Sequence, residues 1–115
     1  MLVKSNQMIP EVREKMRGGS GQVRLEQVFS ADTLPKNVRL SAVITLESGC
    51  SIGWHVHEKE TEIFYFVSGA GTADDNGEKV TVSAGDCIVT PDGCGHAVEN
   101  TGSEPLKFFA VIVLN

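Results

Sequence analysis

The chain has 115 residues and a mass of 12.4 kDa, the size of a single domain. Hydrophobic residues make up 41% of the chain and charged residues 22%, a composition that excludes general disorder. The longest uncharged apolar run, residues 108–114, is only seven residues long, whereas a membrane helix needs about 20.

The charge is unevenly spread along the chain. Residues 1–40 carry seven basic and four acidic side chains, whereas residues 41–115 carry three basic and eleven acidic ones. An acidic main body with one Trp and one Tyr does not fit the basic surface that nucleic acids require. The first residues also lack the apolar core and cleavage site of a secretory signal. We therefore expect a cytoplasmic protein with neither a nucleic-acid nor a membrane partner.

The amino-terminal segment differs from the rest of the chain. Residues 10–17 begin with a proline at a position suited to the first turn of a helix, and two glycines follow them. This pattern predicts a helix of about two turns, followed by a glycine-rich connector over residues 18–21. We therefore expect an N-terminal extension over residues 1–21 and the main domain over residues 22–115.

From residue 22 onward, apolar and polar residues alternate with the period of two that is typical of half-buried strands. Glycines and prolines separate these stretches, and Asn76-Gly77 is a hairpin signal because it tolerates positive φ angles. About nine short strands are expected in an all-β sandwich or barrel. Strands are predicted within residues 23–28, 38–47, 63–67, 80–82, 87–90, 96–99 and 106–114.

The three histidines of the chain are the candidates for chemistry. His55 and His57 lie two residues apart, so both rings leave the same face of an extended strand. Glu62 opens the next expected strand, which a hairpin would place beside the first. His96 must arrive from a distant strand, and only the fold can bring it there. Three imidazoles and one carboxylate together would suit a divalent ion such as Zn, Cu, Fe, Ni or Mn.

Two spaced motifs in this sequence resemble those of the cupins. The first resembles G(X)5HXH(X)3-4E(X)6G, and the second resembles G(X)5PXG(X)2H(X)3N, at every specified position. The first runs from Gly49 through His55, His57 and Glu62 to Gly69, and the second from Gly85 through Pro91, Gly93 and His96 to Asn100. The chain is therefore identified as similar to a small single-domain cupin.

The resemblance implies a cupin jelly-roll barrel, also called a double-stranded β-helix. It implies one divalent metal ion per chain, of the Fe, Mn, Ni, Zn or Cu type, as cofactor. It also implies turn roles for Gly69, Gly85 and Gly93 and a structural role for Asn100. The implied metal ligands are His55, His57, Glu62 and His96.

A reading without a metal treats the histidines as ordinary core or surface residues and Glu62 as part of a solvated acidic turn. Against it, burying three imidazoles and a carboxylate with no cation would cost several kcal/mol. Phe64 and Phe66 share the parity of Glu62, so both rings point inward if the carboxylate does. These rings would serve either as core or as substrate contacts. Trp54 has the opposite parity to the histidines and would lie on the other face.

No internal anion clamp is visible in the motifs. Arg24, Arg39 and Lys107 are candidates for one only if they face inward. Cys50, Cys87 and Cys94 are odd in number and form no CxxC pair, so they are interpreted as free thiols, with inert packing favoured over a role at the site.

Two functions remain open. The favoured one is a metal-dependent enzyme of dioxygenase, isomerase or decarboxylase type that acts on a small molecule. The sequence offers it no general acid or base, because Tyr65 is out of phase with Glu62 and Asp92 lies in a loop. The alternative is a non-catalytic module that binds or senses a small molecule. In either case we expect a homodimer in which the early residues lie across the partner's sheet.

Overall fold

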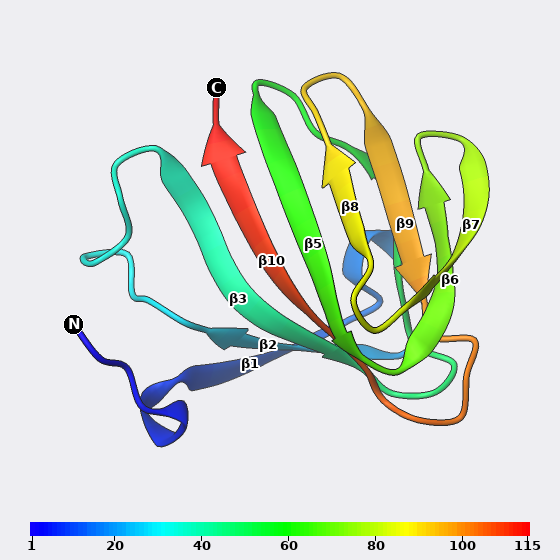
Figure 1. Cartoon of the computed structure of the whole chain (residues 1–115), viewed down its shortest axis with the longest axis horizontal. Helices are drawn as coiled ribbons and strands as arrows, with labels where there is room; N and C mark the ends of the chain where they lie inside the picture. The colour runs from blue at the N-terminus through cyan, green and yellow to red at the C-terminus, as the bar shows by residue number, and fades with distance from the viewer.

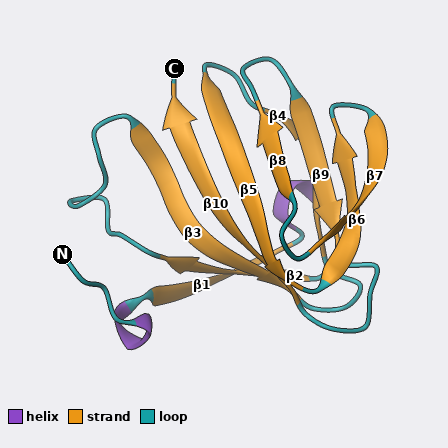
Figure 2. Ribbon diagram, viewed as in Figure 1, coloured by secondary structure: helices purple, strands orange, loops and turns teal.

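A computed structural model describes every residue from Met1 to Asn115. Ten strands form two antiparallel sheets that face each other as the two walls of a barrel (Figure 1). The only helical segments are two three-residue 3-10 turns, η1 (Ser5–Gln7) and η2 (Met16–Gly18) (Figure 2). Neither has the length or the apolar character that crossing a bilayer requires. The predicted all-β jelly-roll architecture is confirmed.

The two sheets differ in size. The larger has six strands in the order β1-β2-β3-β10-β5-β8, and the smaller has four in the order β4-β9-β6-β7. The strands of the larger sheet are β1 (Ile9–Glu14), β2 (Gln22–Gln27), β3 (Val38–Leu46), β10 (Leu106–Leu114), β5 (Glu60–Ser68) and β8 (Cys87–Thr90). Those of the smaller are β4 (Ser51–Val56), β9 (Gly95–Glu99), β6 (Ala70–Asp75) and β7 (Glu78–Ser83).

The hydrophobic core lies between the sheets, where alternate residues of each strand point inward. Phe64, Phe66 and Phe108 pack together, with ring centroids 4.7 to 6.2 Å apart. The predicted parity is confirmed, because Glu62, Phe64 and Phe66 are all buried. The core comprises Val23, Leu25, Ile44, Leu46, Ile52, Phe64, Phe66, Ala73, Val82, Ile88, Val98, Leu106, Phe108 and Ala110.

Asn100 has the structural role that the motif implies. Its side chain is fully buried, and its amide nitrogen donates to the carbonyl oxygens of Leu46 and Glu104, both at 2.8 Å. Its amide oxygen accepts from the backbone N–H of Gly102 at 2.9 Å. One side chain thereby ties the end of β3 to the loop that precedes β10, and leaves no buried polar atom without a partner.

The predicted helix over residues 10–17 is wrong. Ile9–Glu14 is instead an edge strand that pairs with β2, with Val12 opposite Arg24. An isolated helix of two turns is marginal in water, whereas this strand satisfies the backbone groups along the edge of β2. Pro10 is tolerated because β1 has no neighbour on its other side.

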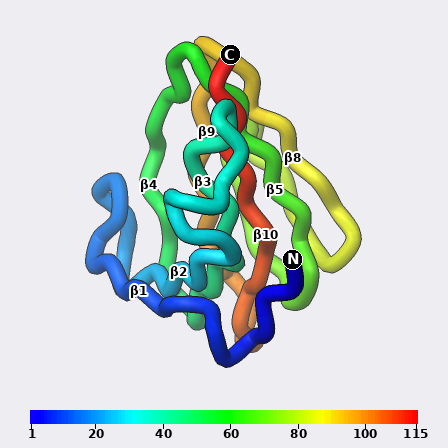
Figure 3. The backbone as a smooth tube through the Cα atoms, turned by 90° about the vertical axis from the view of Figure 1, so that its left-hand side faces the viewer, coloured from blue at the N-terminus to red at the C-terminus, as the bar shows by residue number.

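Residues 15–21, which we call the mouth loop, follow β1 and lie against β4. Figure 3 shows this loop in blue beside the green tube of β4. The backbone N–H of Ser51 donates to the carbonyl oxygen of Ser20 at 2.9 Å, and the N–H of Ser20 donates to Oγ of Ser51 at 2.8 Å. The connector expected over residues 18–21 is therefore fixed to the barrel wall.

The expectation that β4 and β5 pair as a hairpin is also wrong. β4 pairs with β9 in the smaller sheet, whereas β5 pairs with β10 and β8 in the larger one. The chain crosses between sheets in the segment from His57 to Lys59, where Lys59 adopts a positive φ of 61°. The backbone N–H of Lys59 donates to Asp92 at 2.6 Å and that of His57 to the Cys94 carbonyl at 2.9 Å. These bonds position the crossover.

Candidate metal centre

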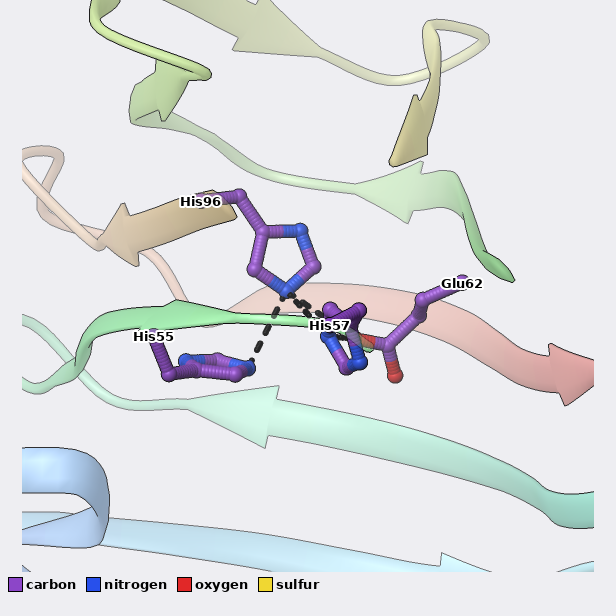
Figure 4. Close-up of side chains that lie close together, drawn as sticks. All are labelled: His55, His57, Glu62 and His96. Carbon is purple, nitrogen blue, oxygen red and sulfur yellow. Dashed lines mark hydrogen bonds and ion pairs between the residues drawn. The ribbon is translucent and has the colours of Figure 1, made fainter. Parts of the chain in front are cut away.

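The four side chains implied as ligands converge between the two sheets (Figure 4). His55 lies on β4 and His96 directly opposite it on β9, and His57 follows the end of β4. Glu62 reaches the same point from β5 in the opposite sheet. The exposed fractions of His57, Glu62 and His96 are only 3%, 4% and 1%, whereas His55 is half-buried.

Four short distances connect the cluster. Nε2 of His96 lies 3.1 Å from Nε2 of His57 and 3.2 Å from Nε2 of His55. Oε1 of Glu62 lies 2.9 Å from Nε2 of His57 and 3.0 Å from Nε2 of His96. All four potential ligand atoms lie within 4.8 Å of one another. They could therefore contact one common ion.

The outward-facing ring nitrogens fix the orientation of each imidazole. Nδ1 of His55 donates to the carbonyl oxygen of Gly53 at 2.9 Å, and Nδ1 of His57 donates to Oε1 of Glu60 at 2.8 Å. Nδ1 of His96 and the hydroxyl of Thr90 are hydrogen-bonded at 2.8 Å. Since a carbonyl or carboxylate oxygen only accepts, Nδ1 of both His55 and His57 carries a proton. This leaves Nε2 as the free lone pair of each neutral ring.

This arrangement fits a cation. When the rings are neutral, the Nε2 lone pairs of His55 and His57 converge with His96 on a carboxylate oxygen of Glu62. These electron-rich atoms repel one another in a buried space that lacks water to screen them. A proton shared between His57 and Glu62 offsets part of this repulsion, but a divalent ion would offset all of it. At metal–ligand distances of about 2.1 Å, adjacent ligands of an octahedral ion lie about 3.0 Å apart, and those of a tetrahedral ion about 3.4 Å. The four short distances fit the octahedral value better.

The charges inside the cluster shift its pKa values. Burial alone would raise the pKa of Glu62, but hydrogen bonds with His57 and His96 hold that pKa below its usual value. The hydrogen bond with Glu62 raises the pKa of His57, with a further contribution from Glu60. Burial lowers the pKa of His55, and nearby His96, His57 and Arg17 add to this lowering. Glu62 is therefore an anion at neutral pH.

Glu60 supports the cluster from outside. Its carboxylate accepts from Nε and Nη2 of Arg39 at 2.8 and 2.9 Å, and from Nδ1 of His57. The Arg39 hydrogen bond outweighs the effect of burial and lowers the pKa of Glu60 to about 2, with a smaller contribution from His57. Glu60 was not expected at the site from the sequence. Its position three residues after His57 was the sequence signal that could have identified it as a partner of that imidazole.

Phe64 joins the core to the site. Its ring stacks on that of His96 with centroids 4.7 Å apart and an angle of 15°, and it also contacts Phe108. Both roles considered for Phe64 are compatible with this position, whereas Phe66 is wholly within the core. Trp54 lies on the exposed face, as its parity predicts. The three cysteines are free, but none is fully buried, and none lines the cavity at the cluster.

A cavity of about 80 Å³ adjoins the cluster. His55, His57 and Glu62 form part of its wall, and seven hydrophobic side chains form most of the rest. Its remaining polar lining consists of three arginines that stay at least partly exposed and so mark its open end. The hydrophobic residues are Met16, Leu25, Leu40, Ile44, Ile52, Phe64 and Ile112, and the arginines are Arg13, Arg17 and Arg39.

Two of these arginines were not expected from the sequence. Arg39 was a candidate and does line the cavity, whereas Arg24 and Lys107 do not. Arg13 and Arg17 come from β1 and the mouth loop, in the segment that was expected to lie outside the barrel. The excess of basic residues in the first 40 positions was the only sequence signal for them. The cavity mouth is consequently more positive than the motifs alone indicate.

Comparison with known proteins agrees with this geometry. The profile of the Cupin domain family matches residues 42–112. The oxalate-binding protein of Thermotoga maritima is 42% identical over 114 residues, which cover 99% of this chain and 94% of that protein. A crystal structure from the same organism, described as a predicted oxalate decarboxylase, has a TM-score of 0.95 and 42% identity and covers all of both chains.

A shorter match extends to a larger protein. The oxalate decarboxylase OxdC of Bacillus subtilis is 34% identical over 76 residues. These residues are 62% of this chain but only 20% of that protein. Two relatives of different size thus carry names that refer to the same small dicarboxylate.

Proposed function

This chain belongs to the cupin family, and from that premise we propose that it binds oxalate or a similarly small dicarboxylate at a divalent metal ion. The ion would be held by His55, His57, Glu62 and His96. When bound there, it would supply Lewis-acid contacts to the oxygens of a chelating dianion. The names of the relatives support this class of ligand.

The composition of the cavity wall carries the proposal. A volume of about 80 Å³ is well below the ~300 Å³ at which pockets for larger metabolites begin, so the cavity suits a ligand of a few heavy atoms. The arginines at its mouth favour an anion. Four protein ligands on an octahedral ion leave two positions, which is what a chelating dicarboxylate occupies.

The same wall favours binding over catalysis. Decarboxylation of oxalate breaks the C–C bond, releases CO₂ and delivers a proton to the remaining carbon, so it needs a proton donor. Besides the cluster and the arginines, the cavity wall is apolar, and arginine keeps its protons at neutral pH. The pKa of Glu60 is about 2, and this carboxylate is already held by Arg39 and His57. We therefore favour the binding module over the enzyme that the sequence alone favoured.

One experiment separates these two functions. Purified protein is stripped of metal, reloaded with Mn(II) and titrated with oxalate in a calorimeter, and CO₂ and formate are assayed in the same samples. We expect one oxalate per chain, retained without turnover. Binding should disappear in the stripped protein and in His57→Ala. Release of formate and CO₂ in equal amounts over many turnovers would instead establish a decarboxylase.

A further inference from the structure

The backbone of the mouth loop packs directly against the backbone of β4. A Cβ atom at Gly53 would collide with the carbonyl oxygen of Arg17, and one at Gly19 with the carbonyl oxygen of Ser51. Only glycine allows such an approach at these two positions. The loop therefore holds the backbone of Arg17 directly against the strand that carries His55.

Two residues of this loop adopt a backbone conformation that non-glycine residues avoid. Lys15 has φ 49° and ψ 44°, and Arg17 has φ 54° and ψ 31°. Such left-handed residues persist only where the surroundings hold them, and they concentrate at functional sites. Here the backbone N–H of Lys15 donates to the Gly21 carbonyl oxygen at 2.8 Å, and that of Gly18 to the Lys15 carbonyl oxygen at 2.9 Å. The strained loop presents the Arg17 side chain to the cavity.

Arg17 is the one cavity arginine whose charge is not already used within the protein. Arg39 forms a bidentate ion pair with Glu60. Arg13 forms an ion pair with Glu11, in which Nε lies 2.7 Å from Oε2. Arg17 forms no ion pair and no side-chain hydrogen bond, although it lines the same cavity as His55 and Glu62. A ligand that occupies this cavity therefore meets one uncompensated arginine in the wall that also contains His55 and Glu62.

We propose that Arg17 is a specificity-determining residue that selects a doubly charged ligand over an isosteric ligand with a single charge. This inference rests on the proposed function and adds to it the residue that recognises the second negative charge. A guanidinium presents a planar fork of N–H donors that matches a carboxylate. Since its backbone is already fixed, only the freedom of its side chain is lost when the ligand binds.

Oxamate is the matched probe, because it has the size and shape of oxalate but replaces one carboxylate by a neutral amide. Loss of a charge-assisted hydrogen bond weakens binding by about 10- to 100-fold. In Arg17→Gln we expect the affinity for oxalate to fall within that range and the affinity for oxamate to fall much less. The preference for oxalate over oxamate should therefore shrink by about tenfold. Arg17→Lys should retain part of it, since lysine supplies charge without the fork.

The control variant is Arg24→Gln, which removes the same charge from an exposed position of β2 outside this cavity. The affinity for Mn(II), measured without oxalate, is a second readout that does not depend on the ligand. It should be unchanged or slightly tighter in Arg17→Gln, because the lost charge repels the cation. A purely structural defect would weaken metal and both ligands together.

The possible results distinguish the two proposals. A lower oxalate affinity and a smaller oxalate preference in Arg17→Gln, with Arg24→Gln like the wild type, would support the role of Arg17. Equal oxalate affinity in wild type and Arg17→Gln would overturn that role and leave the proposed function standing. No oxalate binding by the Mn-loaded wild type would overturn both.

Discussion

Glu60 and His57 form a hydrogen bond of 2.8 Å between Oε1 and Nδ1, on the side of the imidazole that faces away from the cluster. This bond leaves Nε2 of His57 free to face Glu62, 2.9 Å away. Arg39 holds the same carboxylate with two hydrogen bonds. An exposed arginine thus sets the orientation of a buried imidazole through one intervening carboxylate.

This relationship predicts a specific dependence of stability on pH. The pKa of Glu60 is about 2 in the folded protein, below its ordinary value of 4.5. The stabilisation is therefore complete above pH 4.5 and is lost as the pH falls towards 2. Because Arg39 is half-exposed and screened by solvent, we expect this pH-dependent stabilisation to contribute roughly 1–2 kcal/mol to the free energy of unfolding. Urea unfolding of metal-free Glu60→Gln should show a shallower loss of stability across this range.

The matched control for that variant is Glu58→Gln, which removes an exposed carboxylate two residues away. It should follow the wild-type pH profile. Some slope should remain in Glu60→Gln, because hydrogen bonds also hold the pKa of Glu62 below its usual value. Identical profiles for Glu60→Gln and the wild type would show that the pair with Arg39 does not contribute.

Glu62→Gln should weaken metal binding by more than ~100-fold, since loss of a supporting partner alone costs about 10- to 100-fold. The variant keeps the size of the side chain but removes the one anionic donor of the cluster. Competition with a chromogenic chelator measures the change, again with Glu58→Gln as control. Metal affinity that is equal in the two variants would remove Glu62 from the ligand set.

Phe64→Ala should destabilise the protein by about 3–5 kcal/mol, the usual cost of deleting a fully buried phenyl ring. The ring packs against Phe108 and stacks on His96, so the cavity left behind reaches the cluster. Urea unfolding should show a smaller loss for Phe64→Leu and almost none for Val12→Ala, at an exposed position of the edge strand β1. A loss below 1 kcal/mol for Phe64→Ala would contradict this packing.

Gly53→Ala should displace the mouth loop, because the added methyl group would collide with the backbone of Arg17. We expect the affinity for oxalate to fall about tenfold or more, the same loss that we expect when the arginine itself is replaced. Gly85→Ala is the control, since it strains a turn that does not line the cavity, where φ is 94°, and the added methyl group meets no atom. Equal oxalate affinities in the two variants, measured by calorimetry, would show that oxalate binding does not depend on the close contact between the mouth loop and β4.

The homodimer remains a prediction, but we now expect its interface on a different part of the molecule from the early residues. β1 completes the larger sheet of its own chain, so it need not cross a partner. The outer face of that sheet instead exposes adjoining apolar side chains on β5 and β8, where Ile63 lies opposite Val89 and Tyr65 lies two residues further along. An uncharged face of this kind fits a second copy of itself. Light scattering should give a mass near twice 12.4 kDa, and Tyr65→Lys should reduce it to the monomer value.

Local patterns predicted the parts of the fold that depend on neighbouring residues. The alternation along β3 and β10, the Asn76-Gly77 turn and the shared inward face of Glu62 and Phe64 follow from a period of two or from the conformational freedom of a single turn. The convergence of His96 with His55 came only from the family motifs, because strand pairing over 41 residues leaves no local signal.

The errors arise where tertiary structure overrides a local pattern. Residues 10–17 suit a short helix when considered alone, but in the barrel Ile9–Glu14 completes the open edge of β2, and this tertiary contact outweighs helix propensity. The same error concealed Arg13 and Arg17, since residues assigned to an extension are not expected to line a cavity. The hairpin expected between β4 and β5 failed because a short loop can also cross between two sheets.

Elemental analysis of the purified protein tests the central claim most directly. After supplementation with Mn, Fe, Ni, Zn and Cu in turn and removal of loosely bound ions, the wild type should retain close to one divalent ion per chain, and His96→Ala should retain almost none. Retention of only a trace of each metal by the wild type would contradict a metal centre at this cluster.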